Sequence, residues 1–112
     1  VIEVSKLATD INMLVNNAGI STFQKLIGAS SSDMARAEME VNYFGLLNMV
    51  RAFAPTLGSN GGGTIVNMSS ILGLVNVPLL GSYCAAKSAV HSMTQGMRAE
   101  LALQKTCGLV HF

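Results

Sequence analysis

Two residues in the last third of the chain have types and a spacing that could perform acid–base chemistry. Tyr83 and Lys87 are four positions apart, so on a helix they share one face and their functional groups lie close together. A positive charge beside a phenol favours the phenolate form, which makes the phenol a usable proton donor and acceptor near neutral pH. The pair therefore predicts a proton-transfer site, although this spacing taken alone is more often an exposed helical face.

Two further polar residues could serve the same site. Ser70 and its neighbour Ser69 follow the apolar run at 64–68, which predicts a buried strand, and open α/β sheets place their chemistry at the carboxyl ends of strands. Chemistry alone does not decide which of the two serines acts, because adjacent strand residues face opposite ways. Asn42 is a polar residue inside an otherwise apolar predicted helix, where an amide most often only finds a local partner. Both residues become stronger candidates when they occur together with the Tyr83–Lys87 pair.

A turn of small and amide residues follows the first apolar run of the chain. Asn16-Asn17-Ala18-Gly19 comes directly after residues 10–15, and such residues let the backbone pass close to a ligand, although taken alone the stretch is more often an ordinary turn. The glycine-rich run at 58–63 lies between a predicted helix and a predicted strand. Phosphate-binding loops lie between a strand and the following helix, so this run is a connection only.

The elements that must position these residues alternate along the chain. Strands are predicted at 10–15, at 64–68 and from 108 onward, and helices at 33–57 and 82–103. The first strand is typical of a parallel strand that is buried on both faces. This order predicts the α/β class, with a doubly wound, Rossmann-like parallel sheet.

The composition indicates that the chain is covered by something else. Half of the 112 residues are hydrophobic and only 12% are charged, which is unusually apolar for a free-standing domain of this size. Missing sequence or a partner subunit explains this balance, so we expect residues 1–112 to be one partial domain of a longer protein. The side chains Phe44, Leu47 and Met49 are expected to serve both the core and a subunit contact.

Charge and cysteine content exclude several classes of function. The net charge of +1 gives no electrostatic reason to bind nucleic acid or an anionic membrane. Cys84 and Cys107 form no metal-binding or disulfide-rich pattern, so we expect no metal site and a reducing compartment. The sequence shows no signal peptide and no run long enough to span a membrane, and a cytoplasmic location follows as an expectation.

The motifs taken together resemble the short-chain dehydrogenase/reductase family. The resemblance extends over essentially the whole chain and rests on the turn at 16–19, the interior Asn42, the Ser-x-x-Gly pattern that begins at Ser70, and the Tyr-x-x-x-Lys pair. It implies hydride transfer between a nicotinamide cofactor, NAD or NADP, and a small-molecule carbonyl or alcohol. The resemblance also implies a homodimer or homotetramer that forms through the helices at 33–57 and 82–103.

The resemblance assigns roles residue by residue. It implies Tyr83 as the general acid or base, with a lysine that favours the phenolate and binds the nicotinamide ribose, a serine that polarises the substrate oxygen, and an asparagine that holds a relay water. The implied catalytic residues are Asn42, Ser70, Tyr83 and Lys87. The implied cofactor-binding residues are Asn16, Asn17, Ala18, Gly19, Tyr83 and Lys87.

Two departures from the family pattern keep an alternative open. The family's glycine-rich dinucleotide loop and its substrate lid find no match in the sequence, nor does the residue that distinguishes NAD from NADP. The alternative is a truncated, non-enzymatic fragment or binding module that pairs with intact subunits through its long apolar helices. An enoyl reductase or a sugar-nucleotide epimerase of the wider superfamily fits the motifs less well.

Overall fold

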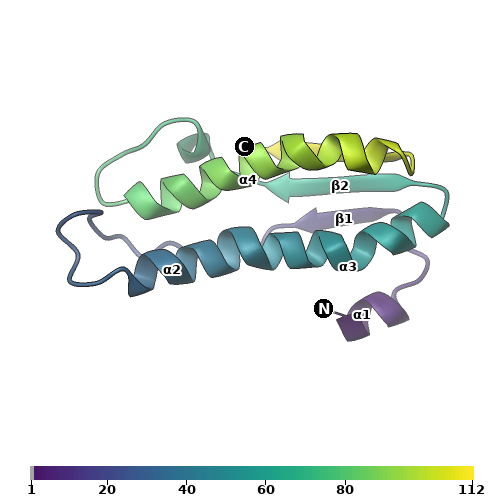
Figure 1. Ribbon diagram of the computed structural model, residues 1–112, viewed down its shortest axis with the longest axis horizontal. Helices are drawn as coiled ribbons and strands as arrows, with labels where there is room; N and C mark the ends of the chain where they lie inside the picture. Colours follow the sequence, from purple (N-terminus) through teal and green to yellow (C-terminus); the bar gives the residue numbers. More distant parts are fainter. Residues whose placement is uncertain (1) are drawn as a thin grey trace.

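The computed structural model describes residues 2–112 and shows strands alternating with helices (Figure 1). The strands are β1 (Met13–Asn16), β2 (Gly63–Met68) and β3 (Thr106–His111). The α-helices are α1 (Ile2–Leu7), α2 (Asp33–Met39), α3 (Leu46–Ser59) and α4 (Gly81–Ala102). A π-helical segment, η1 (Glu40–Gly45), joins α2 to α3, and a short 3₁₀ turn, η2 (Ile71–Gly73), follows β2.

The three strands form one parallel sheet in the order β1-β2-β3. Its register aligns Leu14 with Ile65 and Ile65 with Gly108. Each crossover between neighbouring strands contains a long helix, which is the connection that parallel strands require. The predicted parallel α/β fold is therefore confirmed, with element ends within three residues of those expected.

Both long helices pack on the same face of this sheet, and Figure 1 shows α3 and α4 lying in front of the strands. The core between these layers consists of Leu14, Leu46, Val50, Phe53, Leu57, Ile65, Val90, Met97 and Leu101. On the opposite face Met13, Val15 and Leu109 are exposed. The prediction that the first strand is buried on both faces is thus wrong for the described chain, since only alternate residues of β1 contact a helix layer.

The segment from α2 to α3 forms one almost continuous helical path. Its π-helical turn is wider than an α-helical turn, and such turns often occur at functional sites. Pro55 lies inside α3, which ends at Ser59, close to the predicted end at 57. Along this path Phe44 is exposed, whereas Leu47 and Met49 are half-buried.

Helix α4 carries an apolar stripe at helical spacing. The stripe residues are Ala86, Val90, Met93, Met97 and Leu101, of which all but the half-buried Met93 are buried. Cys84 is also buried. A network of three polar side chains connects this helix to the sheet, because Asn16 donates to Asn67 and Asn67 donates to Thr94, at 2.9 Å in each case. All three side chains are buried and hydrogen-bonded, which fixes β1, β2 and α4 relative to one another.

Two features are absent from the described residues. No helix in this part of the chain has the length and apolar character needed to cross a membrane. The same residues contain no group of three or more His, Cys, Asp or Glu side chains arranged to hold a metal ion.

Candidate active site

The predicted site residues come from elements that meet at one edge of the sheet. Strands β1 and β2 are parallel, so their carboxyl ends at Asn16 and Met68 lie side by side. The loops that follow them, and the first turns of α2 and α4, lie at the left end of the molecule in Figure 1. This is the edge at which open parallel sheets bind ligands.

Tyr83 and Lys87 share one face of α4, as their spacing predicts. The Lys87 ammonium nitrogen lies 5.7 Å from the centre of the Tyr83 ring. The Lys87 side chain is only 5% exposed, and its Nζ donates a hydrogen bond of 3.1 Å to the carbonyl oxygen of Met68. Burial lowers the pKa of Lys87 below its ordinary value, because desolvation disfavours the charged form. The site therefore contains a fixed, poorly hydrated cation beside a phenol.

Asn42 holds the loop after β1 from within the π-helical turn. Its side chain is 1% exposed and makes two hydrogen bonds of 2.8 Å, accepting from the Ile20 amide and donating to the Ile20 carbonyl. The neighbouring Gly19 lies close to both side chains, since a Cβ there would lie 3.3 Å from Asn42 Oδ1, a tight contact, and 3.5 Å from Lys87 Nζ. Asn42 and Lys87 therefore converge on the backbone of Gly19.

The four residues of the turn after β1 divide into two groups. Asn16 is buried and bonded to Asn67, so it stabilises the sheet. Asn17, Ala18 and Gly19 are exposed, and Gly19 lies beside the Lys87 ammonium. A cation next to open backbone at the end of a parallel strand is a suitable partner for the hydroxyl groups of a ribose.

The two serines after β2 have different surroundings. The Ser70 hydroxyl accepts a hydrogen bond of 3.1 Å from the Leu72 amide, and its own proton has no acceptor among the residues that the structure describes. It is therefore free to donate to a ligand. The Ser69 hydroxyl instead donates to the Lys87 carbonyl at 3.1 Å, so Ser69 anchors α4.

Gly73 explains why a glycine follows Ser70 in the Ser-x-x-Gly pattern. A Cβ at Gly73 would lie 3.0 Å from the carbonyl oxygen of Lys87 and 2.9 Å from the Ser69 hydroxyl. The first of these atoms belongs to the backbone of α4 and cannot move without moving the helix. Glycine at this position thus allows the Ser70 turn to pack directly on the segment that carries the lysine.

We expect Gly73→Ala to destabilise the complete protein by about 1–3 kcal/mol, because the added methyl group overpacks this contact. Gly96→Ala is the matched control, since Gly96 lies in α4 and a Cβ there would meet nothing within 4 Å. Alanine in this open helical position should stabilise the protein by about 0.5–1 kcal/mol. Urea unfolding of both variants measures the two effects. Changes of the same sign in the free energy of unfolding would contradict the packing explanation.

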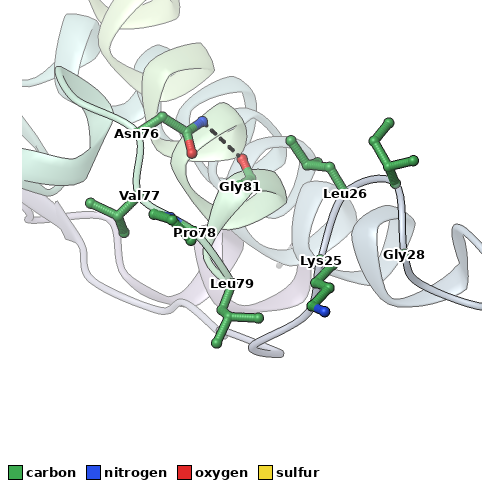
Figure 2. Close-up of a pocket in the computed structure, with 9 residues that line it drawn as sticks. Lys25, Leu26, Gly28, Asn76, Val77, Pro78, Leu79 and Gly81 are labelled. Atoms are coloured by element: carbon green, nitrogen blue, oxygen red, sulfur yellow. Dashed lines mark hydrogen bonds between the residues drawn. The ribbon is translucent and has the colours of Figure 1, made fainter.

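An open pocket lies beside the start of α4 and has a volume of about 670 Å³. One wall is the segment 25–28 of the loop after β1, and the other is the segment 76–79 that follows η2, with Gly81 between them. Figure 2 shows Val77, Pro78 and Leu79 on one side of the pocket and Leu26 on the other. The walls are mainly apolar. Gly81, the first residue of α4, lines the pocket and lies two residues before Tyr83.

Sequence reasoning did not single out Glu38, which is 1% exposed at the same end of the molecule. Its carboxylate accepts hydrogen bonds from Thr22 and Ser82. The one sequence signal that could have identified Glu38 is its spacing of four residues from Asn42, which places both polar side chains on one face of the helical path.

Comparison with known proteins agrees with this geometry. The family model for the short chain dehydrogenases matches residues 1–107. Human dehydrogenase/reductase SDR family member 7 is 39% identical over 92 residues, which cover 82% of this chain and 27% of that protein. The crystal structure of a Burkholderia cenocepacia short-chain dehydrogenase in complex with NADP is 48% identical and has a TM-score of 0.92.

A second solved structure supports the same fold. The gluconate 5-dehydrogenase of Burkholderia cenocepacia, in complex with NADP and tartrate, is 32% identical with a TM-score of 0.89. Both Burkholderia structures match 97% of this chain, but the chain covers only 47% and 43% of theirs. The chain thus spans about a quarter of its human relative and less than half of these solved structures. Its three-stranded parallel sheet corresponds to part of their Rossmann-type fold.

Proposed function

The chain belongs to the short-chain dehydrogenase/reductase family, and from this we propose that the complete protein is an NAD(P)-dependent oxidoreductase that interconverts a carbonyl compound and an alcohol. The observation that carries the proposal is the position of Lys87. Its ammonium lies 5.7 Å from the Tyr83 ring and beside the open backbone of Gly19. One cation can therefore serve both the acid–base residue and a bound nucleotide.

The proton chemistry is assigned to the residues of this chain. In reduction the Tyr83 hydroxyl donates its proton to the substrate oxygen, and in oxidation the phenolate accepts that proton. The Ser70 hydroxyl donates a hydrogen bond to the same oxygen and polarises the carbonyl. This role is supported by the hydroxyl proton of Ser70, which has no acceptor among the described residues. The Lys87 charge favours the phenolate, and Asn42 holds the water that connects the lysine to solvent.

The cofactor site is assigned to the turn after β1 together with α4. Asn17, Ala18 and Gly19 provide the backbone surface, Asn16 supports them from the sheet, and Lys87 and Tyr83 bind the ribose. A bound NAD or NADP supplies or accepts the hydride, which no amino-acid side chain can do. The NADP complexes of the two Burkholderia relatives support a nicotinamide cofactor of this type.

The pocket beside α4 supports a substrate with an apolar body. Its two walls bring mainly aliphatic side chains next to the turn that carries Tyr83. A pocket of about 670 Å³ is large enough for a molecule of drug-like size. We therefore assign the pocket to the non-reacting part of an aldehyde, a ketone or the corresponding alcohol.

The test is a spectrophotometric assay of the complete protein for oxidation of NADPH or NADH with small and long-chain aldehydes and ketones. The proposal expects turnover that depends on both the carbonyl compound and the nicotinamide. A complete protein that binds neither cofactor would contradict the proposal and would support the alternative, a non-enzymatic binding module.

Self-association through the helical path at 33–59 and through α4 is part of the same proposal. The exposed Phe44 and the half-buried Leu47 and Met49 provide apolar surface on that path. Light scattering of the complete protein at micromolar concentration should give the mass of a dimer or a tetramer. A monomer at that concentration would contradict this part. Cytoplasmic location stays a prediction.

A further inference from the structure

Glu38 is a buried carboxylate for which the proposed mechanism has no use. Its side chain is 1% exposed and lies in the last turn of α2. Its Oε1 accepts from the Thr22 amide at 2.7 Å and from the Thr22 hydroxyl at 2.5 Å, while its Oε2 accepts from the Ser82 hydroxyl. Within the described residues all of its partners are thus hydroxyl groups and one amide, and none is a basic side chain.

A carboxylate is a costly residue to bury without a cation, and an aliphatic side chain would fill the same space at lower cost. What the carboxylate adds is a connection between two separate segments. Thr22 belongs to the loop after β1, and Ser82 belongs to the first turn of α4. The hydrogen bonds of Glu38 therefore join elements that no local sequence interaction could hold together.

Both segments border the proposed site. Thr22 lies two residues after Ile20, which Asn42 holds by two hydrogen bonds, so the helical path fixes this loop at two points. The same loop continues into one wall of the pocket, at 25–28. Ser82 lies between Gly81, which lines the pocket, and Tyr83.

We propose that Glu38 is a positioning residue that fixes Tyr83 relative to the pocket wall at 25–28. The inference rests on the proposed function. Through Ser82 the carboxylate sets the start of α4, and through Thr22 it sets the loop that forms the wall. The space between the phenol and the apolar lining then depends on hydrogen bonds to one side chain. Glu38 acts through these neighbours and does not itself contact the reacting atoms.

The test uses variants of the complete protein that separate hydrogen bonding from charge. Glu38→Met removes every acceptor while keeping a similar volume. Glu38→Gln should rescue the function, because its amide oxygen can accept from Thr22 and its amide nitrogen can donate to the Ser82 hydroxyl. Glu40→Met is the matched control, since Glu40 is exposed and lies two residues further along the same path.

We expect Glu38→Met to lower kcat about 10- to 100-fold through misplacement of the phenol. KM for a long-chain aldehyde should change more than KM for a small one, because the pocket wall moves. Glu38→Gln and Glu40→Met should keep the kcat and KM values of the unchanged protein. Ser82→Ala should reproduce the loss of kcat and Ser82→Thr should restore it, which keeps the test decisive if Glu38→Met fails to fold.

A spectroscopic readout separates failure of this inference from failure of the proposed function. In NMR spectra of the protein with isotope-labelled tyrosine, the ring signal of Tyr83 is identified by its absence in the Tyr83→Phe variant. Glu38→Met should shift or broaden this signal while leaving that of Tyr43 in place, whether or not any substrate turns over. An unshifted Tyr83 signal in both Glu38→Met and Ser82→Ala overturns the inference, as do kinetics identical to those of Glu40→Met. Absence of turnover in the unchanged protein overturns the proposed function instead.

Discussion

Tyr83→Phe should lower the turnover of the complete enzyme about 10²- to 10⁴-fold, the range lost when a positioned acid–base group is removed. The substitution deletes one hydroxyl and keeps the ring beside the Lys87 ammonium. That hydroxyl has no hydrogen-bond partner among the described residues, so its loss should leave the free energy of unfolding nearly unchanged. The Kd for NADPH should rise by less than about tenfold, because only one hydrogen bond to the ribose is lost while the lysine and the backbone at 17–19 remain in place.

The chain offers a matched control for this variant in its other tyrosine. Tyr43 lies in the π-helical segment, packs edge-on against Phe44 at 4.9 Å, and has no role in the proposed chemistry. Tyr43→Phe removes the same hydroxyl group and should retain normal turnover. If Tyr83→Phe kept near-normal turnover, or if the two variants lost activity equally, the assignment of Tyr83 as the acid–base residue would be wrong.

The parts of this site that the sequence could predict are those set by local geometry. Helical spacing places Tyr83 and Lys87 on one face, and a polar residue at the end of an apolar strand places Ser70 at the edge of the sheet. Both arrangements depend on residues close together in the chain. Periodicity therefore predicts them well.

The parts that the sequence could not predict depend on distant contacts. A glutamate on a helix is usually exposed, and nothing local indicates that Glu38 finds partners 16 and 44 positions away. The π-helical turn around Asn42 likewise leaves no mark in the apolar pattern. The apolar run of β1 could not reveal that only one of its faces is covered in the described chain, since both faces carry apolar residues.

Lys87→Met should lower turnover at least about 10²-fold, because it removes the charge that favours the phenolate. It should also weaken NADPH binding more than Tyr83→Phe does, since the charged lysine is assigned to the nicotinamide ribose as well as to the phenol. Steady-state kinetics and fluorescence titration with NADPH measure the two effects. Loss of turnover with unchanged affinity would contradict the double role of the lysine.

The same variant should change the pH dependence of stability. Burial lowers the pKa of Lys87 in the folded state below its ordinary value of 10.5, so the unfolded chain binds more protons between the two values. The free energy of unfolding therefore rises with pH in that window. At a pH below this window Lys87 is charged in both the folded and the unfolded state, and the full cost of burying its charge lowers the stability. At a pH above the window Lys87 is neutral in both states, and this cost is absent.

Lys87→Met removes the titrating group, so its advantage in stability over the unchanged protein should be greatest near neutral pH and should shrink as the pH approaches 10.5. Urea unfolding of the cofactor-free protein from about pH 7 to about pH 10 measures this difference. Lys6→Met is the control, because Lys6 is exposed on α1 and its replacement should give no such trend. A pH-independent difference for Lys87→Met would contradict the desolvation of the ammonium. The expected trend, combined with lost turnover, would mean that the fold accepts a destabilising buried charge at the one position where the proposed chemistry requires it.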